Sequence, residues 1–279
     1  MTADLHLHTV ASDGTQTIPQ LAARCAALGL FTIGVTDHDR IDPRLGDRVT
    51  MIDGIEVITG IELKADFDGI RGELLGYFVD PGSAALQECI RAMQDARIER
   101  MAAMLDACRE RVGLDISMAE VRAVAAGSLG RPHLAGLLVA KGAVRTTREA
   151  FDKYIGTGGP CYVPLRKWPF RDVVSAIHDA KGVASLAHPC LMRVEDWGAF
   201  LERLRVAEVD AVEVFYPYDL AAARARAPAE DLRRLAAERG FLATGGSDDH
   251  GPDSVKESLG AIHLPVWHVE ALKRACGVT

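Results

Sequence analysis

Short apolar runs alternate with longer amphipathic segments along most of the chain. The longer segments repeat apolar residues at helical spacing and end at a glycine, as in residues 17–28 and 171–180 and in the stretch that leads to Gly240. The short runs predict β-strands at residues 4–8, 31–36, 56–62, 73–78, 183–187, 211–215 and 241–244. Because this alternation is typical of β-α-β units, we expect an α/β fold with parallel strands and crossover helices.

The middle of the chain departs from this pattern. Pro81 and Gly82 interrupt it, and residues 83–156 are rich in Ala, Arg, Glu, Met and Leu at helical spacing, with no convincing strand. Pro160 and Pro164 mark the return to the earlier pattern. We therefore expect two domains: a core formed by residues 1–82 and 157–279, and a helical insertion subdomain over residues 83–156.

Composition and charge narrow the possible partners. The 279 residues are 48% hydrophobic, which is enough to bury a core and excludes intrinsic disorder. The formal net charge of −7 gives no general attraction to a phosphate backbone, so we expect no long nucleic acid as a partner.

Hydropathy and cysteine usage bear on the compartment. No apolar run approaches the roughly 20 residues of a membrane-spanning helix, and Asp4, His6 and His8 stand where a signal peptide would be apolar. The six cysteines include no C-x-x-C pair, so we expect reduced thiols. The sequence predicts a cytoplasmic protein with no membrane partner, and it leaves the oligomeric state open.

Two histidines on the first expected strand begin a series of candidate metal ligands. The period of two in a strand places His6 and His8 on one face, about 6.5 to 7 Å apart along the backbone, close enough to share an ion. Such a pair alone is often merely exposed. Here, however, Asp13 follows in a loop, and the next strand ends in Asp37-His38-Asp39, which adds carboxylates and a further imidazole.

The other candidates also stand at strand ends. They are Glu62, His188 and the run Asp248-Asp249-His250. In a parallel barrel the carboxyl ends of the strands gather on one rim, where such enzymes build their sites. Five of the nine histidines would meet there with Asp and Glu, a mixed nitrogen and oxygen donor set that suits Zn, Mn or Fe better than Ca. The pattern predicts a multinuclear metal centre.

These motifs together resemble the PHP (polymerase and histidinol phosphatase) family of metallophosphoesterases. The resemblance implies a distorted seven-stranded (β/α) barrel that binds up to three divalent metals. The insertion resembles the stand-alone branch that includes a 3',5'-nucleotide bisphosphate phosphatase and related 5'-exonucleases. The motifs are Asp4-Leu5-His6-Leu7-His8-Thr9, Ser12-Asp13-Gly14, Thr36-Asp37-His38-Asp39, Gly60-Ile61-Glu62, Ala187-His188-Pro189, Gly246-Ser247-Asp248-Asp249-His250 and, in the insertion, Gly130-Arg131-Pro132-His133-Leu134-Ala135.

The resemblance also implies how the ligands divide among the ions. His6, His8, Glu62 and Asp248 would bind one metal, Glu62 would bridge to a second metal that also has His188, and Asp13, His38 and His250 would hold a third. One departure concerns the second site, because Glu73 stands where the family usually has a histidine. Either Glu73 ligates as a carboxylate, which favours harder ions such as Mn or Mg, or the enzyme is dinuclear. We expect two or three divalent ions, with manganese as the first choice and Zn, Fe or Mg as alternatives.

The implied activity is that of a metal-dependent phosphatase, a phosphoric monoester hydrolase. We expect a metal-bound hydroxide to remove the 3'-phosphate of a 3',5'-bisphosphate nucleotide similar to pAp. The alternatives are a histidinol phosphatase, a 5'-exonuclease on short RNA, and a catalytically inactive PHP binding module.

Further residues have candidate roles in catalysis and substrate binding. Three aspartates flank the ligands as possible general acids: Asp37, Asp39 and Asp249. Arg131, His133 and Arg193 are candidates for binding the non-reacting phosphate, because a guanidinium suits phosphate geometry. In the alternative interpretation Arg131 only caps or pairs at the helix start near Pro132. Tyr216 and Tyr218 could stack on a base or pack against a neighbouring loop.

Overall fold

The computed structural model describes residues 1–125, 129–220, 225–252, 254 and 256–278. The chain divides into two compact units. The barrel unit consists of Met1–Cys89 and Lys167–Thr279, and the helical unit is Ile90–Arg166. The domain limits expected from sequence, after residues 82 and 156, stay a prediction.

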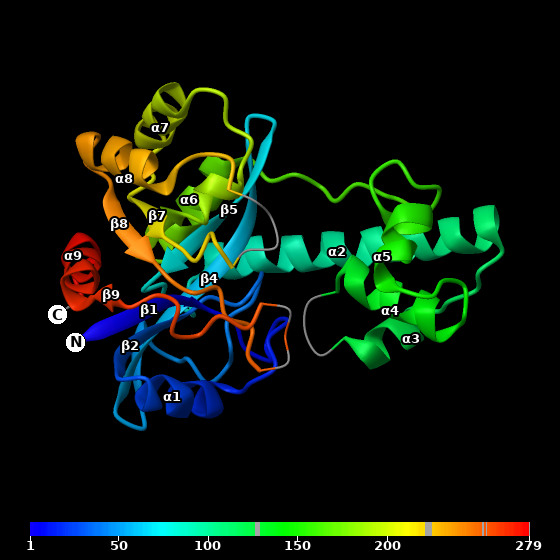
Figure 1. Cartoon of the computed structure of the whole chain (residues 1–279), viewed down its shortest axis with the longest axis horizontal. Helices are drawn as coiled ribbons and strands as arrows, with labels where there is room; N and C mark the ends of the chain where they lie inside the picture. The colour runs from blue at the N-terminus through cyan, green and yellow to red at the C-terminus, as the bar shows by residue number, and fades with distance from the viewer. Residues whose placement is uncertain (126–128, 221–224, 253, 255, 279) are drawn as a thin grey trace. The chain divides into compact units, whose positions relative to one another are not determined.

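The barrel unit is built on one nine-stranded sheet (Figure 1). Seven strands follow one another as β1-β2-β4-β5-β6-β7-β8. The chain after β8 then returns to β1, because Leu7 and Asp249 form a parallel bridge and the His8 N–H donates to the Asp249 carbonyl at 3.0 Å. The expected seven-stranded, distorted barrel is therefore confirmed, and β3 and β9 extend it beside β4 and β1. The bounds are β1 (Thr2–Leu7), β2 (Leu30–Val35), β3 (Val49–Ile52), β4 (Ile55–Phe67), β5 (Ile70–Tyr77), β6 (Val183–Leu186), β7 (Ala211–Phe215), β8 (Leu242–Gly245) and β9 (Leu264–Pro265).

Strand β5 runs antiparallel to both of its neighbours in the ring, so the expectation of uniformly parallel strands was wrong at this point. β4 continues past its expected end at Glu62 to Phe67, and only Asp68 and Gly69 separate it from β5. Both residues have positive φ, +54° and +100°. A connection of two such residues forms a tight hairpin, and a hairpin makes adjacent strands antiparallel. As a result Glu73 pairs with Lys64, beyond Glu62, at the edge where the strand ends meet.

Five helices pack around the barrel: α1 (Ile18–Ala27), α6 (Phe170–Asp179), α7 (Trp197–Val206), α8 (Ala229–Glu238) and α9 (Val266–Cys276). The first of them shows how the sequence sets these helices. Thr17 begins α1 by a capping box, since its N–H donates to the Gln20 side chain at 2.9 Å. The apolar face of α1 then buries Leu21 and Cys25 against strand residues such as Ile33.

In the described residues of the helical unit, every regular element is a helix. They are α2 (Ala84–Val112), which begins in the barrel unit, α3 (Met118–Val124), α4 (Arg131–Ala140) and α5 (Thr147–Ala150), which continues as a π-helical turn over Phe151–Ile155. The unit has its own core, in which Met104 and Cys108 of α2 pack with Leu134 and Leu138 of α4. The helical insertion expected from the sequence is thus present.

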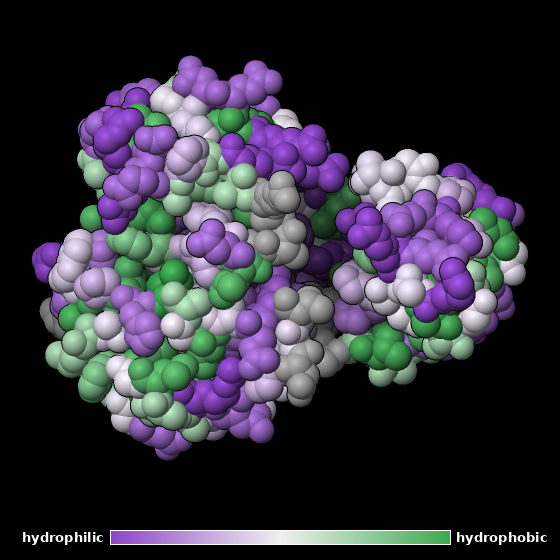
Figure 2. All heavy atoms as spheres, in the orientation of Figure 1, coloured by the Kyte–Doolittle hydropathy of each residue, from purple (hydrophilic) through white to green (hydrophobic). Residues whose placement is uncertain are grey.

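Three further observations concern the surface, the helices and the cysteines. Figure 2 shows polar and apolar residues interspersed on the visible face of the barrel unit. Among the described residues, no helix is both long enough and apolar enough to cross a membrane. All six cysteines are free thiols, as expected.

Candidate metal centre

Ionisable side chains from six strands meet at one rim of the barrel unit. Three overlapping groups have ligand atoms close enough together to hold a cation. The His6 group is His6, His8, Glu62 and Asp248; the Asp13 group is His8, Asp13, His38 and His250; the Glu73 group is His38, Glu62 and Glu73. His188 contacts both carboxylates of the Glu73 group. The structure thus brings together all nine side chains that the sequence analysis selected as metal ligands.

The close approach of β8 to β1 depends on a glycine. A Cβ on Gly246 would lie 2.3 Å from the His6 backbone nitrogen, which no other residue could tolerate without a shift of the strands. The chain just beyond Gly246 can therefore bond to β1, and the Asp248 N–H donates to the His6 carbonyl at 2.8 Å. Asp248 itself has φ +56°, a left-handed conformation that is rare outside glycine and is common at functional sites.

The His6 group has the spacing of a set of metal ligands. His8 Nε2 lies 3.2 Å from Asp248 Oδ1 and 3.3 Å from Glu62 Oε2, and the corresponding His6 Nε2 distances are 3.5 and 3.4 Å. Two ligands bound to one ion at about 2.1 Å lie about 3.0 to 3.4 Å apart for tetrahedral or octahedral angles. The observed spacing is close to that range.

These same atoms lack hydrogen bonds of regular geometry, although Glu62 Oε2 also lies 3.0 Å from His38 Nδ1. All four side chains are buried, with at most 3% of each exposed. Four of their atoms make no hydrogen bond among the described residues: His6 Nε2, His8 Nε2, Glu62 Oε2 and Asp248 Oδ1. Buried polar atoms are normally bonded, because leaving one unsatisfied costs about 1 to 3 kcal/mol. The residues of the His6 group therefore fit a bound divalent cation, which would satisfy all four atoms.

The charges of the group favour positive charge at its centre. Burial opposes ionisation of Glu62, but the imidazoles of His38 and His6 outweigh burial and hold the pKa of this carboxyl well below its usual range. Burial likewise opposes charge on His8, yet the nearby carboxylates of Asp248 and Glu62 raise its pKa to about 9. The ionised carboxylates of Glu62 and Asp248 are thus stabilised by positive charge at the centre of the group, either from protonated imidazoles or from a metal ion.

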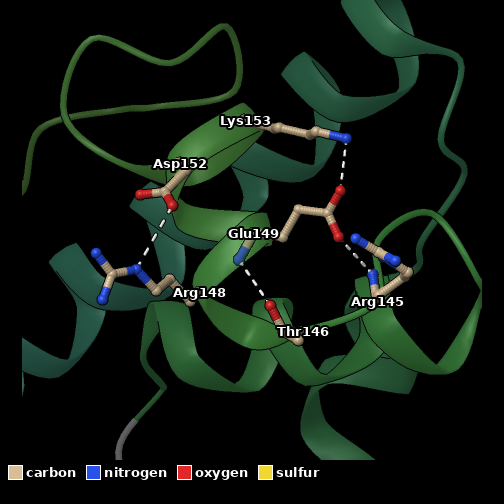
Figure 3. A pocket seen from close by; sticks show the side chains of 6 residues that line it. All are labelled: Arg145, Thr146, Arg148, Glu149, Asp152 and Lys153. Atoms are coloured by element: carbon tan, nitrogen blue, oxygen red, sulfur yellow. Dashed lines mark hydrogen bonds and ion pairs between the residues drawn. The ribbon is translucent and has the colours of Figure 1, made fainter.

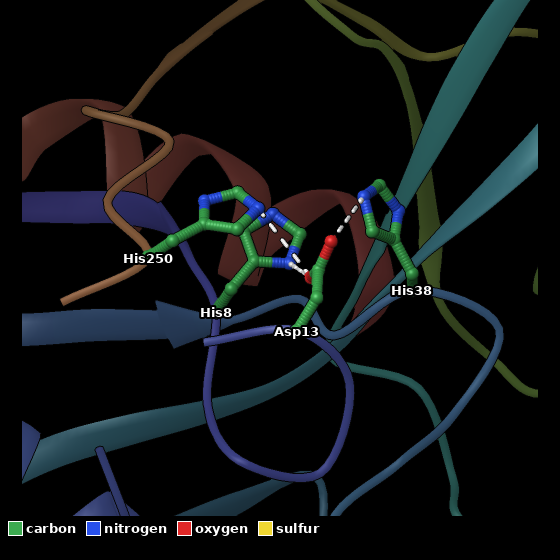
Figure 4. A group of neighbouring side chains, drawn as sticks. All are labelled: His8, Asp13, His38 and His250. Carbon is green, nitrogen blue, oxygen red and sulfur yellow. Dashed lines mark ion pairs between the residues drawn. The ribbon is translucent and has the colours of Figure 1, made fainter. Parts of the chain in front are cut away.

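The Asp13 group extends the cluster towards solvent (Figure 4). Asp13 is about half exposed, and its Oδ1 lies 3.4 Å from His250 Nε2 and 3.8 Å from His8 Nδ1. Its Oδ2 lies 3.9 Å from His38 Nε2. His8 faces both groups with opposite ring nitrogens, and its shorter contacts are those in the His6 group. His8, Asp13, His38 and His250 form one candidate group, and the smaller ligand set of Asp13, His38 and His250 stays a prediction.

The Glu73 group differs because a lysine competes for it. Glu73 Oε2 lies 3.4 Å from His188 Nε2, which is also 3.0 Å from Glu62 Oε1. The other oxygen of Glu73 is ion-paired with Lys64, its cross-strand partner. Burial raises the pKa of Glu73, but the Lys64 ammonium outweighs burial and holds it below its usual range. Glu73 thus faces the centre and already has one cation beside it.

Of the three expected general-acid candidates, two are occupied by hydrogen bonds that hold loops in place. Asp37 accepts from the Thr9 N–H at 2.8 Å and the Thr9 hydroxyl at 2.6 Å, and so fixes the chain after β1. Asp249 accepts from the N–H groups of Ser258 and Leu259 at 2.7 and 3.0 Å. Asp39 is buried next to the ligand His38, and its N–H donates to the Glu62 carbonyl at 3.0 Å. The contacts of Asp37 and Asp249 are those of positioning residues, and a general acid stays a prediction.

Two side chains that the sequence analysis did not place at the metal centre hold the outer oxygen of Asp248. The Tyr216 hydroxyl donates to Oδ2 at 2.9 Å, and the Lys256 ammonium is 2.9 Å from the same atom. Oδ1 is left for the His6 group. Tyr216 follows the end of β7, a signal that the sequence shows, whereas Lys256 lies in a loop with no periodic pattern to single it out.

The expected phosphate-binding residues lie in both units. Arg131, at the start of α4 in the helical unit, donates to the Ile155 carbonyl at 3.4 Å and stands 5.2 Å from the centroid of the Phe151 ring. His133 Nδ1 accepts the Gly130 N–H at 3.1 Å, an N-terminal cap of the same helix. Arg193 is exposed in the barrel unit, shortly after the motif that contains His188. Their roles in substrate binding stay predictions.

A concavity of about 580 Å³ lies in the helical unit, lined by Arg145, Thr146, Arg148, Glu149, Asp152 and Lys153 (Figure 3). It is wide open, and four of its five charged side chains form two ion pairs. Lys153 pairs with Glu149, and Arg148 lies 3.8 Å from Asp152. These are ion pairs along one turn of helix, and they indicate a solvated surface.

Comparison with known proteins gives a family and several relatives. The sequence model of the PHP domain matches residues 4–150. A 3',5'-nucleoside bisphosphate phosphatase from Chromobacterium violaceum is 28% identical, and the alignment covers 95% of this chain and 94% of the relative. A 5'-3' exoribonuclease from Haemophilus influenzae is 30% identical over 73% of each chain. A phosphoribosyl 1,2-cyclic phosphate 1,2-diphosphodiesterase from Eggerthella lenta is 30% identical over 90% of this chain and 95% of the relative.

A solved structure shares the whole fold. It is a protein from Bifidobacterium adolescentis, described as a candidate metal-dependent phosphoesterase, with a TM-score of 0.79 and 25% sequence identity. The match covers 98% of this chain and 95% of that one.

Proposed function

The chain belongs to the PHP domain family and is a metal-dependent phosphoesterase, and on this basis we propose that it removes the 3'-phosphate from 3',5'-bisphosphate nucleotides. The observation that carries the hydrolytic function is the His6 group, a buried donor set with four atoms that make no hydrogen bond among the described residues. The bisphosphate substrate is supported by the Chromobacterium violaceum phosphatase, which aligns with 95% of this chain.

The ligands suggest how the ions are held. The His6 group would hold one ion, Asp13, His38 and His250 a second, and Glu62, His188 and Glu73 a third where it binds. Divalent ions in such sites polarise phosphate oxygens, and they lower the pKa of a bound water molecule to near neutrality. Two firmly bound ions and a weaker third are proposed, with manganese first, because the donor set combines imidazole and carboxylate. A cytoplasmic location is also proposed, and the six free thiols support it.

The chain's own residues would orient the substrate. Asp13 is half exposed whereas the His6 group is buried, so the reacting phosphate would enter past Asp13. Asp37, Asp39 and Asp249 stay the aspartates proposed to donate a proton to the leaving alkoxide, because each is adjacent in sequence to a proposed metal ligand. Arg131, His133 and Arg193 are proposed to bind the second phosphate, since a guanidinium can donate two parallel hydrogen bonds to it.

A 5'-3' exoribonuclease acting on short RNA is the second candidate, because the relative from Haemophilus influenzae is named a 5'-3' exoribonuclease. The net charge of −7 makes long RNA a poor ligand but does not exclude a short one.

A substrate panel with the manganese-loaded protein separates the candidates. The panel contains adenosine 3',5'-bisphosphate, 5'-AMP, histidinol phosphate and a short 5'-phosphorylated RNA. We expect the highest kcat/KM on the bisphosphate, with 5'-AMP as the product by chromatography. A higher kcat/KM for mononucleotide release from the RNA would assign the exoribonuclease function, and a preference for histidinol phosphate would reject both nucleotide functions. A protein that cannot be loaded with metal would be an inactive binding module.

A further inference from the structure

One buried carboxylate outside the three groups contacts two of the candidate metal ligands. Glu213 lies on β7 in the apolar run Ala211–Phe215, and none of its side chain is exposed. Its Oε1 lies 2.9 Å from His6 Nδ1, and its Oε2 accepts the His188 N–H at 2.6 Å. Glu213 therefore joins two candidate metal ligands, one from β1 and one that follows β6.

The chemistry of these two contacts fixes a proton. A carboxylate only accepts hydrogen bonds, so the nitrogen that faces it must carry hydrogen. Glu213 thus selects the form of His6 with a proton on Nδ1. The opposite nitrogen, Nε2, faces Glu62 and Asp248 at 3.4 and 3.5 Å and is left to bind a cation.

The contact with His188 acts on the backbone. His188 has φ +26° and ψ 54°, an unusual conformation for a residue other than glycine, and such conformations persist only where the surroundings hold them. A charge-assisted hydrogen bond from a fully buried carboxylate supplies such a hold. In this conformation His188 Nε2 reaches Glu62 and Glu73 at 3.0 and 3.4 Å.

We propose that Glu213 is a positioning residue of the metal centre, which sets the tautomer of His6 and the backbone of His188 so that both imidazoles present Nε2 to the ions. The inference rests on the proposed metal sites and is independent of which phosphate ester is the substrate. Partners of ligating histidines typically contribute about 10- to 100-fold to metal affinity.

Glu213→Gln tests the proposal with almost no change in shape. An amide has one accepting and one donating end. Because the His188 N–H is a fixed donor, the amide oxygen must face it, and the amide NH₂ then faces His6 Nδ1. That nitrogen must become an acceptor, so the proton moves to Nε2, where it opposes metal binding.

Asp210→Asn is a matched control in the same unit. Asp210 Oδ2 also joins a histidine to a backbone N–H, with His178 Nε2 at 2.8 Å and Ala184 N–H at 2.7 Å, but neither partner belongs to the metal centre. The same change of carboxylate to amide there should leave metal binding unaltered.

The measurements are the Kd for zinc, by competition with a chelator, and the imidazole NMR signals of ¹⁵N-histidine-labelled, zinc-loaded protein. We expect the zinc Kd to rise about 10- to 100-fold in Glu213→Gln and not in Asp210→Asn. We also expect a downfield His6 Nδ1 proton in the wild type that Glu213→Gln loses. Wild-type zinc affinity in a folded Glu213→Gln protein would overturn the proposal.

The wild-type spectrum keeps the test decisive if Glu213→Gln does not fold. A His6 that binds zinc through Nδ1, or that carries its proton on Nε2, would overturn the proposal by itself. Failure of the bisphosphate assay would leave both readouts intact, so the two proposals can fail separately.

Discussion

The two dense clusters of charged side chains in this protein have opposite properties. At the rim of the barrel unit the four side chains of the His6 group are buried, and four of their polar atoms make no hydrogen bond among the described residues. In the concavity of the helical unit Arg148 is 91% exposed and Lys153 is 57% exposed, and each has an acidic partner four residues away. The first cluster needs an additional cation for electrical and hydrogen-bonding balance. In the second cluster, two exposed ion pairs and the surrounding water already stabilise the charges.

This difference shows which property marks a functional site. A concavity with charged walls costs the fold little, because exposed ion pairs contribute at most about 1 kcal/mol each. Buried polar atoms without partners destabilise the fold, so their presence indicates a ligand that compensates for them. Unsatisfied buried groups, and not the size of a hollow, distinguish the metal centre from the helical concavity.

The largest loss of activity is expected when a ligand of the His6 group is removed. We expect Asp248→Ala or His8→Ala to lower kcat/KM by at least about 1000-fold while the fold is retained, because loss of the ion removes the main source of transition-state stabilisation. Assays at saturating manganese, elemental analysis and circular dichroism check this. Near-normal activity in a folded, metal-saturated variant would remove these residues from the catalytic centre.

Arg131→Ala tests whether the helical unit contributes to function outside its concavity. On a bisphosphate nucleotide we expect the loss of about 2 to 4 kcal/mol of transition-state stabilisation, or roughly a 30- to 1000-fold fall in kcat/KM, because one phosphate loses its charged partner. An aryl monophosphate should be almost unaffected. Equal losses on both substrates would mean that Arg131 serves the reacting phosphate or, through its contacts with Phe151 and Ile155, the fold. No loss on either substrate would indicate that Arg131 is a surface charge without a role in substrate binding.

A smaller effect, on the amount of bound metal, is expected from substitutions in the Glu73 group. Glu73→His introduces the histidine that the family resemblance implies at this position, and it removes the carboxylate that Lys64 neutralises. We expect bound metal to rise by up to about one ion per chain, measured by elemental analysis after gel filtration. Lys64→Met is the companion variant, since it keeps Glu73 and removes its competing cation. Unchanged metal content in both variants would show that this end of the cluster is already fully occupied or does not bind an ion.

The smallest effect is expected in the helical concavity. Arg148→Ala removes an exposed side chain whose ion pair with Asp152 is long, at 3.8 Å. We expect kcat/KM to stay unchanged and Tm to move by no more than about 2 °C, by enzyme assay and thermal unfolding. A large loss of activity would contradict the view that this concavity is only a solvated surface.

Much of the fold and the ligand set could be predicted because the pattern of strand ends is local. His6, His8 and Glu62 each stand at or near the end of an apolar run, and parallel strands bring such ends together. The direction of β5 could not be predicted in this way, since alternation shows that a strand exists but not which way it runs. The short Asp68-Gly69 turn was the available signal, and it was not recognised because β4 was expected to end at Glu62.

The partners of the ligands were harder to predict. Glu213 is a single acidic residue in an apolar strand, and its two contacts come from residues 25 and more than 200 positions away. Lys256 reaches Asp248 from a loop whose sequence has no repeating pattern. The boundary between the units could not be predicted for a different reason. Helix α2 continues through that boundary, so the helical spacing of the sequence does not change at the point where one compact unit ends and the other begins.

The closing contact of the barrel joins chain segments that are made at very different times. Asp248 bonds to the His6 backbone across about 240 residues, and the bridge from Leu7 to Asp249 spans the same interval. A ribosome that adds about 5 to 20 residues per second needs roughly 12 to 50 s to cover that length. During this interval His6 and His8 are already synthesised, but the Asp248 carboxylate that completes the His6 group is not. A polypeptide whose synthesis stops before residue 248 would therefore carry seven of the nine proposed ligands and an incomplete His6 group, so we expect it to have no hydrolytic activity.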